Sequence, residues 1–157
     1  MTLQLNQFNQ IPIKGQLDMK FNPNTVGARI DVSTGGSLIP GTAVKRVASG
    51  VGGGSLPLVV ECAADSDEVW GFINYNLKDT VYNSGDEVGI SLVNGGNVMY
   101  MEASAAIAPN AVVGIVLSGT KVKTSAGGSR DVGRAYDQAV AAGDLIRVIM
   151  LPKTTTT

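Results

Sequence analysis

The sequence predicts an all-β protein, a small antiparallel barrel or sandwich with an extended N-terminal arm and little helix. Two observations lead to this prediction. About nine or ten short segments carry β-branched and apolar residues, several of them at every second position, and glycine-rich turns separate these segments, with 20 Gly in 157 residues. The length is that of one domain with a substantial core.

The first 26 residues differ from the rest and form the predicted arm. They are rich in Gln and Asn, and several of their apolar residues fall in period-two sets, which favours short extended segments over a helix. Such an arm either folds back as an edge strand or reaches onto another subunit, and the sequence leaves both options open. The arm residues that we single out as interface candidates are Leu3, Leu5, Phe8, Ile11, Ile13, Leu17, Met19 and Phe21.

The clearest strand-turn-strand unit is the segment 69–93, which carries the only Trp and two of the four Tyr. Gly85 and Asp86 suit its turn, because Gly accepts a positive φ and Asp accepts hydrogen bonds from nearby backbone amides. Every second residue from Val88 to Leu92 is apolar, so these side chains share one face of a strand.

The same pattern recurs near the C-terminus. Another Gly-Asp pair precedes the β-rich segment 145–150, and the segment 132–136 corresponds to 69–73. A weaker third instance is 40–47. We interpret these segments as a weak internal repeat within one β domain, and not as a solenoid.

Strict alternation in the strand at 69–75 places Trp70 on one face with Phe72, and Ile73 on the other face with Tyr75. Both faces are mostly apolar, which predicts a strand that is covered on both sides, with a neighbouring subunit as one possible cover. Trp70 and Tyr75 therefore join the interface candidates. The alternative is an aromatic platform for a sugar or for a partner protein, formed by Trp70, Tyr75, Tyr82 and Tyr100. A core position is the prediction that we favour for Trp70 and Phe72.

The other predicted elements follow in chain order. The sequence predicts a hairpin at Asn94–Asn97 and a short helix at 137–142. Further strands are expected at 43–47, 58–63, 98–103, 112–117 and 145–151. The resulting domain prediction is an extended arm at 1–26, a single β domain at 27–152 and a mobile C-terminal tail at 153–157.

Composition argues against several kinds of site. The chain has no His, which excludes Ser-His-Asp and Cys-His nucleophile systems and every imidazole-ligated metal site. The single Cys62 is expected to be an ordinary small buried residue. The acidic turn at 64–68 does not match a calcium loop, and the glycine-rich segment 49–57 is not a phosphate-binding loop. We therefore predict no cofactor and no metal.

The charge pattern also bears on partners. The formal net charge is −1, and the 12 Lys and Arg are scattered along the chain, which argues against nucleic acid as a partner. The sequence has no uninterrupted apolar stretch of the ~20 residues that a membrane helix needs, and its first ten residues lack the apolar core of a signal peptide, so no membrane partner is expected.

Several motifs taken together resemble the capsid cement or decoration proteins of tailed bacteriophages. The motifs are WGFINYNLK at 70–78, SGDEV at 84–88, NVMYMEA at 97–103, and VGRA at 132–135 followed by AAGDLIRV at 141–148. Their order along the chain carries the resemblance, which runs over roughly residues 38–151.

The resemblance implies a noncatalytic virion protein, made in the cytoplasm of the bacterial host, that binds the outer surface of the expanded head. It would lie between major capsid protein subunits as a homodimer or homotrimer, and would stabilise the shell against the pressure of packaged DNA. One alternative is a phage fibre domain or carbohydrate-binding module that contacts the host surface. Another is a trimeric nucleotide hydrolase of dUTPase type, but none of that family's motifs surrounds the available Asp residues.

Overall fold

The computed structural model describes residues 13–17, 25–31, 37–47, 56–76, 81–116, 120–125 and 130–151. Within these residues the prediction of an all-β chain is confirmed, because the regular elements are ten strands and one 3-10 turn. The elements are β1 (Thr25–Ile30), β2 (Ala43–Arg46), β3 (Leu58–Glu61), β4 (Gly71–Ile73), β5 (Glu87–Leu92), η2 (Val93–Gly95), β6 (Val98–Glu102), β7 (Val112–Ile115), β8 (Val122–Thr124), β9 (Asp131–Ala135) and β10 (Leu145–Met150).

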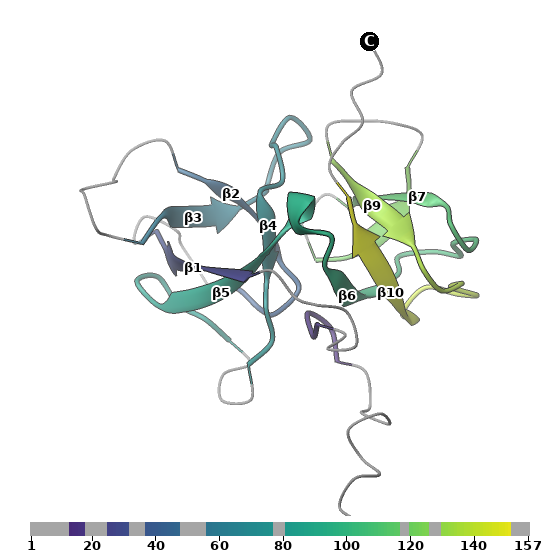
Figure 1. The fold of residues 1–157 in the computed structure, drawn as a ribbon, viewed down its shortest axis with the longest axis horizontal. Helices are drawn as coiled ribbons and strands as arrows, with labels where there is room; N and C mark the ends of the chain where they lie inside the picture. The colour runs from purple at the N-terminus through teal and green to yellow at the C-terminus, as the bar shows by residue number, and fades with distance from the viewer. Residues whose placement is uncertain are drawn as a thin grey trace, which may run out of the picture.

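The strands form two groups, which Figure 1 shows side by side. The first five close into a barrel in the order β1-β3-β2-β4-β5, and the last five form a sheet in the order β6-β10-β9-β7-β8. Ala103, just after β6, makes a parallel bridge to Val122 of β8, so the ends of the second sheet also meet. We call the two groups the barrel and the C-terminal sheet.

Three details differ from the sequence prediction. The barrel is not wholly antiparallel, because β1 and β3 pair in parallel. The turn expected at Asn94–Asn97 does not close a hairpin, since β5 pairs with β1 and β4 while β6 pairs with β10. That turn connects the barrel to the C-terminal sheet. The segment 137–142 forms bends and an isolated bridge at Ala139, with no helix.

The two groups of strands have the same topology. Each strand of the barrel matches the strand five places later: the antiparallel pairs β1·β5, β4·β5, β2·β4 and β2·β3 correspond to β6·β10, β9·β10, β7·β9 and β7·β8. The parallel pair β1·β3 corresponds to the parallel bridge between Ala103 and Val122. The chain is therefore an internal duplication of a five-stranded unit.

Equivalent backbone hydrogen bonds confirm this duplication. Gly85 has a φ of 89° and donates its N–H to the carbonyl of Ile30 at 2.9 Å, and Gly143, with a φ of 93°, donates to that of Ala103 at 2.8 Å. The following Asp of each pair accepts a hydrogen bond from the amide three residues before it, as the Gly-Asp pattern predicted.

A second pair of equivalent turns corrects the predicted repeat. Gly41 has a φ of 82° and donates to the carbonyl of Ile73, while Asn110, whose φ is 62°, donates to that of Ala135. Asn is among the few residues other than Gly that adopt this conformation readily. The third instance expected at 40–47 is thus part of the first unit and corresponds to 109–116 in the second.

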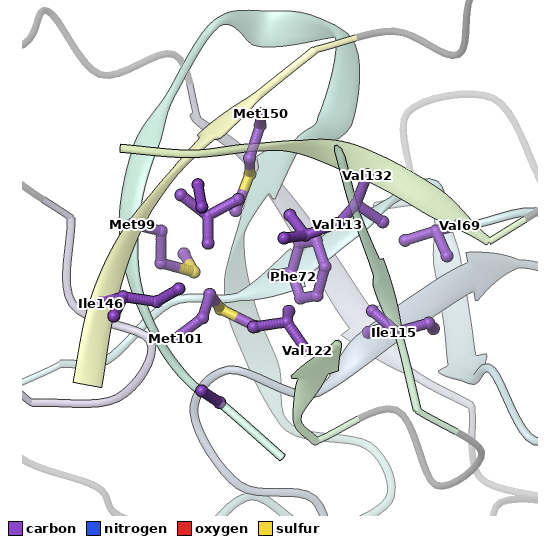
Figure 2. Close-up of a cluster of buried hydrophobic side chains, with 14 of the residues drawn as sticks. Val69, Phe72, Met99, Met101, Val113, Ile115, Val122, Val132, Ile146 and Met150 are labelled. Carbon is purple, nitrogen blue, oxygen red and sulfur yellow. The ribbon is translucent and has the colours of Figure 1, made fainter. Parts of the chain in front are cut away.

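The hydrophobic core has two parts, and β4 contributes to both. Ile73 points into the barrel, whereas Phe72 points the other way and packs inside the C-terminal sheet, where Figure 2 shows it among Met101, Val113 and Val132. All three residues of β4 are buried, as expected for a strand covered on both sides. The cover on the Phe72 side is the chain's own C-terminal sheet rather than a neighbouring subunit.

The expected pairing of Trp70 with Phe72 on one face is wrong. Trp70 packs against the barrel core, while Val69 lies with Phe72 in the core of the C-terminal sheet. Regular alternation begins only at Gly71, because β4 spans three residues. The division into an arm at 1–26, a domain at 27–152 and a tail at 153–157 remains a prediction.

Candidate functional site

The described part of the arm, residues 13–17, lies along the outer edge of β6. Gly15 donates its N–H to the carbonyl of Tyr100 at 2.8 Å, and the N–H of Tyr100 donates to the carbonyl of Gln16 at 2.9 Å. Leu17 forms an antiparallel bridge with Met99 and packs against the core of the C-terminal sheet. Among the described residues, this edge of the sheet is otherwise paired only at its end, where Ala103 bridges Val122, so the arm segment extends the pairing along β6.

The barrel supplies the other side of this arm-docking site. The N–H of Tyr75 donates to the carbonyl of Gly15 at 2.9 Å. Gly15 has a φ of 78°, and a Cβ at this position would lie 2.5 Å from the backbone nitrogen of Gly41 and 2.9 Å from the Cβ of Pro40. Only glycine fits here without displacing backbone atoms. The arm segment therefore contacts both units of the duplication.

Charge pairs reinforce the docked segment. Glu102, at the end of β6, lies 3.6 Å from the Nζ of Lys14 and 2.6 Å from the Nζ of Lys121. Hydrogen bonding from Lys121, with further attraction from both lysines, lowers the pKa of the Glu102 carboxyl below its ordinary value. Burial lowers the pKa of Lys14, an effect that the attraction of Glu102 opposes. The carboxylate is thus the shared partner of the arm and of the segment that precedes β8.

The interface candidates from the sequence fall in different places. Leu17 is half-buried in the docking site, and Ile13 is 39% exposed beside it. Tyr75 follows β4 and contributes its backbone amide, whereas Trp70 precedes β4, so the two aromatic residues lie at opposite ends of this strand. The candidates that lie outside the described residues are Leu3, Leu5, Phe8, Ile11, Met19 and Phe21.

Sequence reasoning missed most of the residues that form the docking site. A Lys-Gly pair at 14–15 inside an apolar arm was the available signal, since a lone glycine in an extended segment marks a close backbone approach. Nothing local marked Pro40 and Gly41 as the opposing surface, because they come from another part of the chain. Tyr82, which was considered for an aromatic platform, is 2% exposed and belongs to the barrel core.

A second polar cluster ties the barrel to the C-terminal sheet. Arg130 is buried, and it donates to the carbonyl of Cys62 at 2.8 Å and to the carboxylate of Asp65 at 3.1 Å. Burial, followed by the negative charge of Asp67, raises the pKa of the Cys62 thiol to about 12. A thiol in this state is a poor nucleophile, so Cys62 serves as a core residue at this junction.

The described residues lack both a cluster of metal ligands and a membrane-spanning helix. In the described part of the chain, no three His, Cys, Asp or Glu side chains gather closely enough to hold a metal ion. The same residues contain no helix of the length and apolarity that a membrane crossing requires.

The fold is shared with a solved structure. No protein-family model and no curated protein matches the chain. The N base of the head fiber protein gp8.5 of bacteriophage phi29 matches with a TM-score of 0.52 and 14% identity, over 81% of this chain and 92% of that chain. At this identity the likeness establishes a common fold, which covers most of both chains.

Proposed function

We propose that this chain is a noncatalytic structural protein of a phage virion, which binds the outer surface of the mature capsid and cements neighbouring major capsid protein subunits. The observation that carries the proposal is the fold shared with the head fiber base of phi29. The ordered motifs between residues 38 and 151 that resemble decoration proteins support it independently. Its partners would be the major capsid protein and further copies of itself, as a homodimer or homotrimer.

The anchored arm supports a bracing role. Residues 13–17 are fixed on β6 by backbone hydrogen bonds and on Glu102 by charge, so the twelve preceding residues are tethered at one defined point. Among these twelve residues, Leu3 and Leu5 alternate with polar neighbours, a pattern suited to strand addition on a neighbouring subunit. Many copies on a symmetric shell would then act together, because each weak contact is made at a high effective concentration.

A second candidate is the base of a fibre that projects from the head, which the same structural likeness favours. In that role the chain would still bind capsids, but it would display another segment rather than stabilise the shell. A carbohydrate-binding role would need an exposed aromatic platform. Of the four aromatic residues considered for one, Tyr82 is buried and Trp70 is half-buried.

The test is co-sedimentation of the purified chain with expanded phage heads that lack it. We expect saturable binding at a fixed number of copies per capsid subunit, with heads that then resist heating. A variant that lacks residues 1–12 should keep its thermal unfolding temperature and bind more weakly, while the exposed control Val140→Ala should bind normally. Binding without added heat resistance would favour the fibre base, and a folded protein that does not bind would refute both roles.

A further inference from the structure

The duplication makes it possible to compare the same end of each unit. In the C-terminal sheet, four side chains at one end of the core are almost completely buried: Met99, Ile115, Val132 and Met150. Their neighbours in the same cluster include Ala43, Val69 and Phe72, which come from the barrel. Figure 2 shows the Phe72 ring among the side chains of that core. The barrel therefore fills this end of the C-terminal sheet.

The equivalent end of the barrel is different. The strand registers match Met99, Ile115, Val132 and Met150 to Val26, Arg46, Trp70 and Leu92. We call these four residues the Trp70 end. Val26, Trp70 and Leu92 are the partly buried members of the barrel cluster, and Arg46 is exposed. In the C-terminal sheet, Phe72 and its neighbours cover the equivalent end. No group of apolar side chains among the described residues covers the Trp70 end in this way.

The exposed Arg46 indicates polarity at the rim. Its guanidinium lies 5.6 Å from the centre of the Trp70 ring, and within the described chain it makes no ion pair. The matching position in the C-terminal sheet is Ile115, which is 2% exposed. An arginine at the position equivalent to that buried isoleucine suits a binding partner that carries a carboxylate, because the two opposite charges would pair at the contact.

A second copy of this chain does not carry the complementary surface. In the barrel, the face that packs into the C-terminal sheet carries Cys62, Val69 and Phe72. The equivalent positions in the C-terminal sheet are Ser125, Asp131 and Arg134, in that order. Arg134 is exposed and would meet Arg46 in a head-to-tail contact. Like charges at a contact disfavour it, so a second copy bound head-to-tail is a poor occupant of the Trp70 end.

We propose that the Trp70 end of the barrel is a docking site for an extended segment of the major capsid protein that presents an aromatic or long aliphatic side chain beside a carboxylate. The apolar side chain would occupy the place that Phe72 takes in the other unit, and the carboxylate would pair with Arg46. The inference rests on the proposed function, and it names the surface through which the barrel contacts the shell. It places that surface at the opposite end of β4 from the arm-docking site.

The experiment compares matched variants of the full chain in co-sedimentation with heads. Arg46→Glu reverses the rim charge, and Lys123→Glu makes the same change at an exposed position of β8. Trp70→Ala removes the apolar surface, with thermal unfolding measured for every variant. We expect Arg46→Glu and Trp70→Ala each to weaken binding by about tenfold or more, as for a central interface residue, and Lys123→Glu to bind as the unaltered chain does.

Each other outcome overturns the proposal in a distinguishable way. If the unaltered chain binds heads and folded Arg46→Glu binds equally well, the Trp70 end is not the contact and the proposed function stands. If the unaltered chain does not bind, both fail. If sedimentation equilibrium shows an oligomer that Arg46→Glu dissociates, a second copy is the occupant. If Phe21→Ala increases acrylamide quenching of Trp70 in the free protein, the chain's own arm is the occupant.

Discussion

Replacing Phe72 with alanine should destabilise the whole molecule, because this side chain joins the two units of the duplication. Phe72 has no exposed surface and projects from β4 of the barrel into the core of the C-terminal sheet. Removing a fully buried Phe side chain loses its transfer free energy and leaves a cavity, which together cost about 3–5 kcal/mol. The cavity would lie among residues of both units, whose backbones are held by their own strand pairing and cannot close around it freely.

That loss is large against the total. A domain of this size has a free energy of unfolding of about 5–15 kcal/mol, so Phe72→Ala should remove about a fifth of it or more. The measurement is urea unfolding followed by the fluorescence of Trp70 in the barrel and by far-ultraviolet circular dichroism of the whole chain. The control is Val140→Ala, since Val140 is 75% exposed and its truncation should change stability by less than about 0.5 kcal/mol.

The shape of the transition carries further information. If Phe72 couples the two units, the variant should show separate transitions by the two probes, with one unit unfolding before the other. A loss below about 1 kcal/mol, with a single transition unchanged in slope, would refute the assignment of Phe72 as the residue that fastens the C-terminal sheet to the barrel.

Four further predictions concern the arm, the turns and the thiol. Gly15→Ala should release the arm segment, detected as faster amide exchange of Tyr100, because its Cβ would meet the backbone of Gly41; unchanged exchange would contradict this. Gly85→Val should cost about 1–3 kcal/mol through strain at a φ of 89°, and unchanged thermal stability would remove the turn assignment. The pKa of the Glu102 carboxyl is lowered in the folded state, so its ionisation stabilises the fold above the ordinary pKa of 4.5, and this stabilisation is lost as the pH falls through the folded pKa. Glu102→Gln should therefore weaken the dependence of unfolding on acid. An identical pH profile of stability for the variant would refute this. Because the pKa of Cys62 is raised to about 12, the native protein should resist thiol reagents that label it at once in urea, and rapid native labelling would contradict its burial.

The sequence predicted the fold class well because the relevant signals are local. The face shared by Val88, Ile90 and Leu92 was confirmed, since Val88 and Ile90 are buried in the barrel core and Leu92 packs against it. The turn at Gly85 and Asp86 was confirmed in conformation and in hydrogen bonding. Such features depend on a few adjacent residues, whose backbone preferences act without help from the rest of the chain.

The arrangement of the units could not be predicted in the same way. The connection at Asn94–Asn97 has the composition of a hairpin turn, but it joins the two units because β5 already has strand partners on both edges. The duplication was visible as a weak repeat, yet its true extent rests on hydrogen bonds at Gly41 and Asn110, two different residues in one conformation. The arm-docking site was missed for a similar reason, as its sides come from segments distant in the sequence.

The two units share one topology but use equivalent positions for different purposes. The outer face of the first unit is apolar at Val69 and Phe72 and receives the second unit, while the same face of the second carries Asp131 and Arg134. Each polar side chain is occupied within its own unit: Ser125 donates to Asp131, and Arg134 donates to the carbonyl of Asn110 at 2.9 Å. A surface that packed on this face as the C-terminal sheet packs on the barrel would break these bonds and bury the charges without partners, which costs free energy. The joining face is thus apolar in the first unit and polar in the second, and the Trp70 end of the first unit is an apolar surface that nothing in the described chain covers.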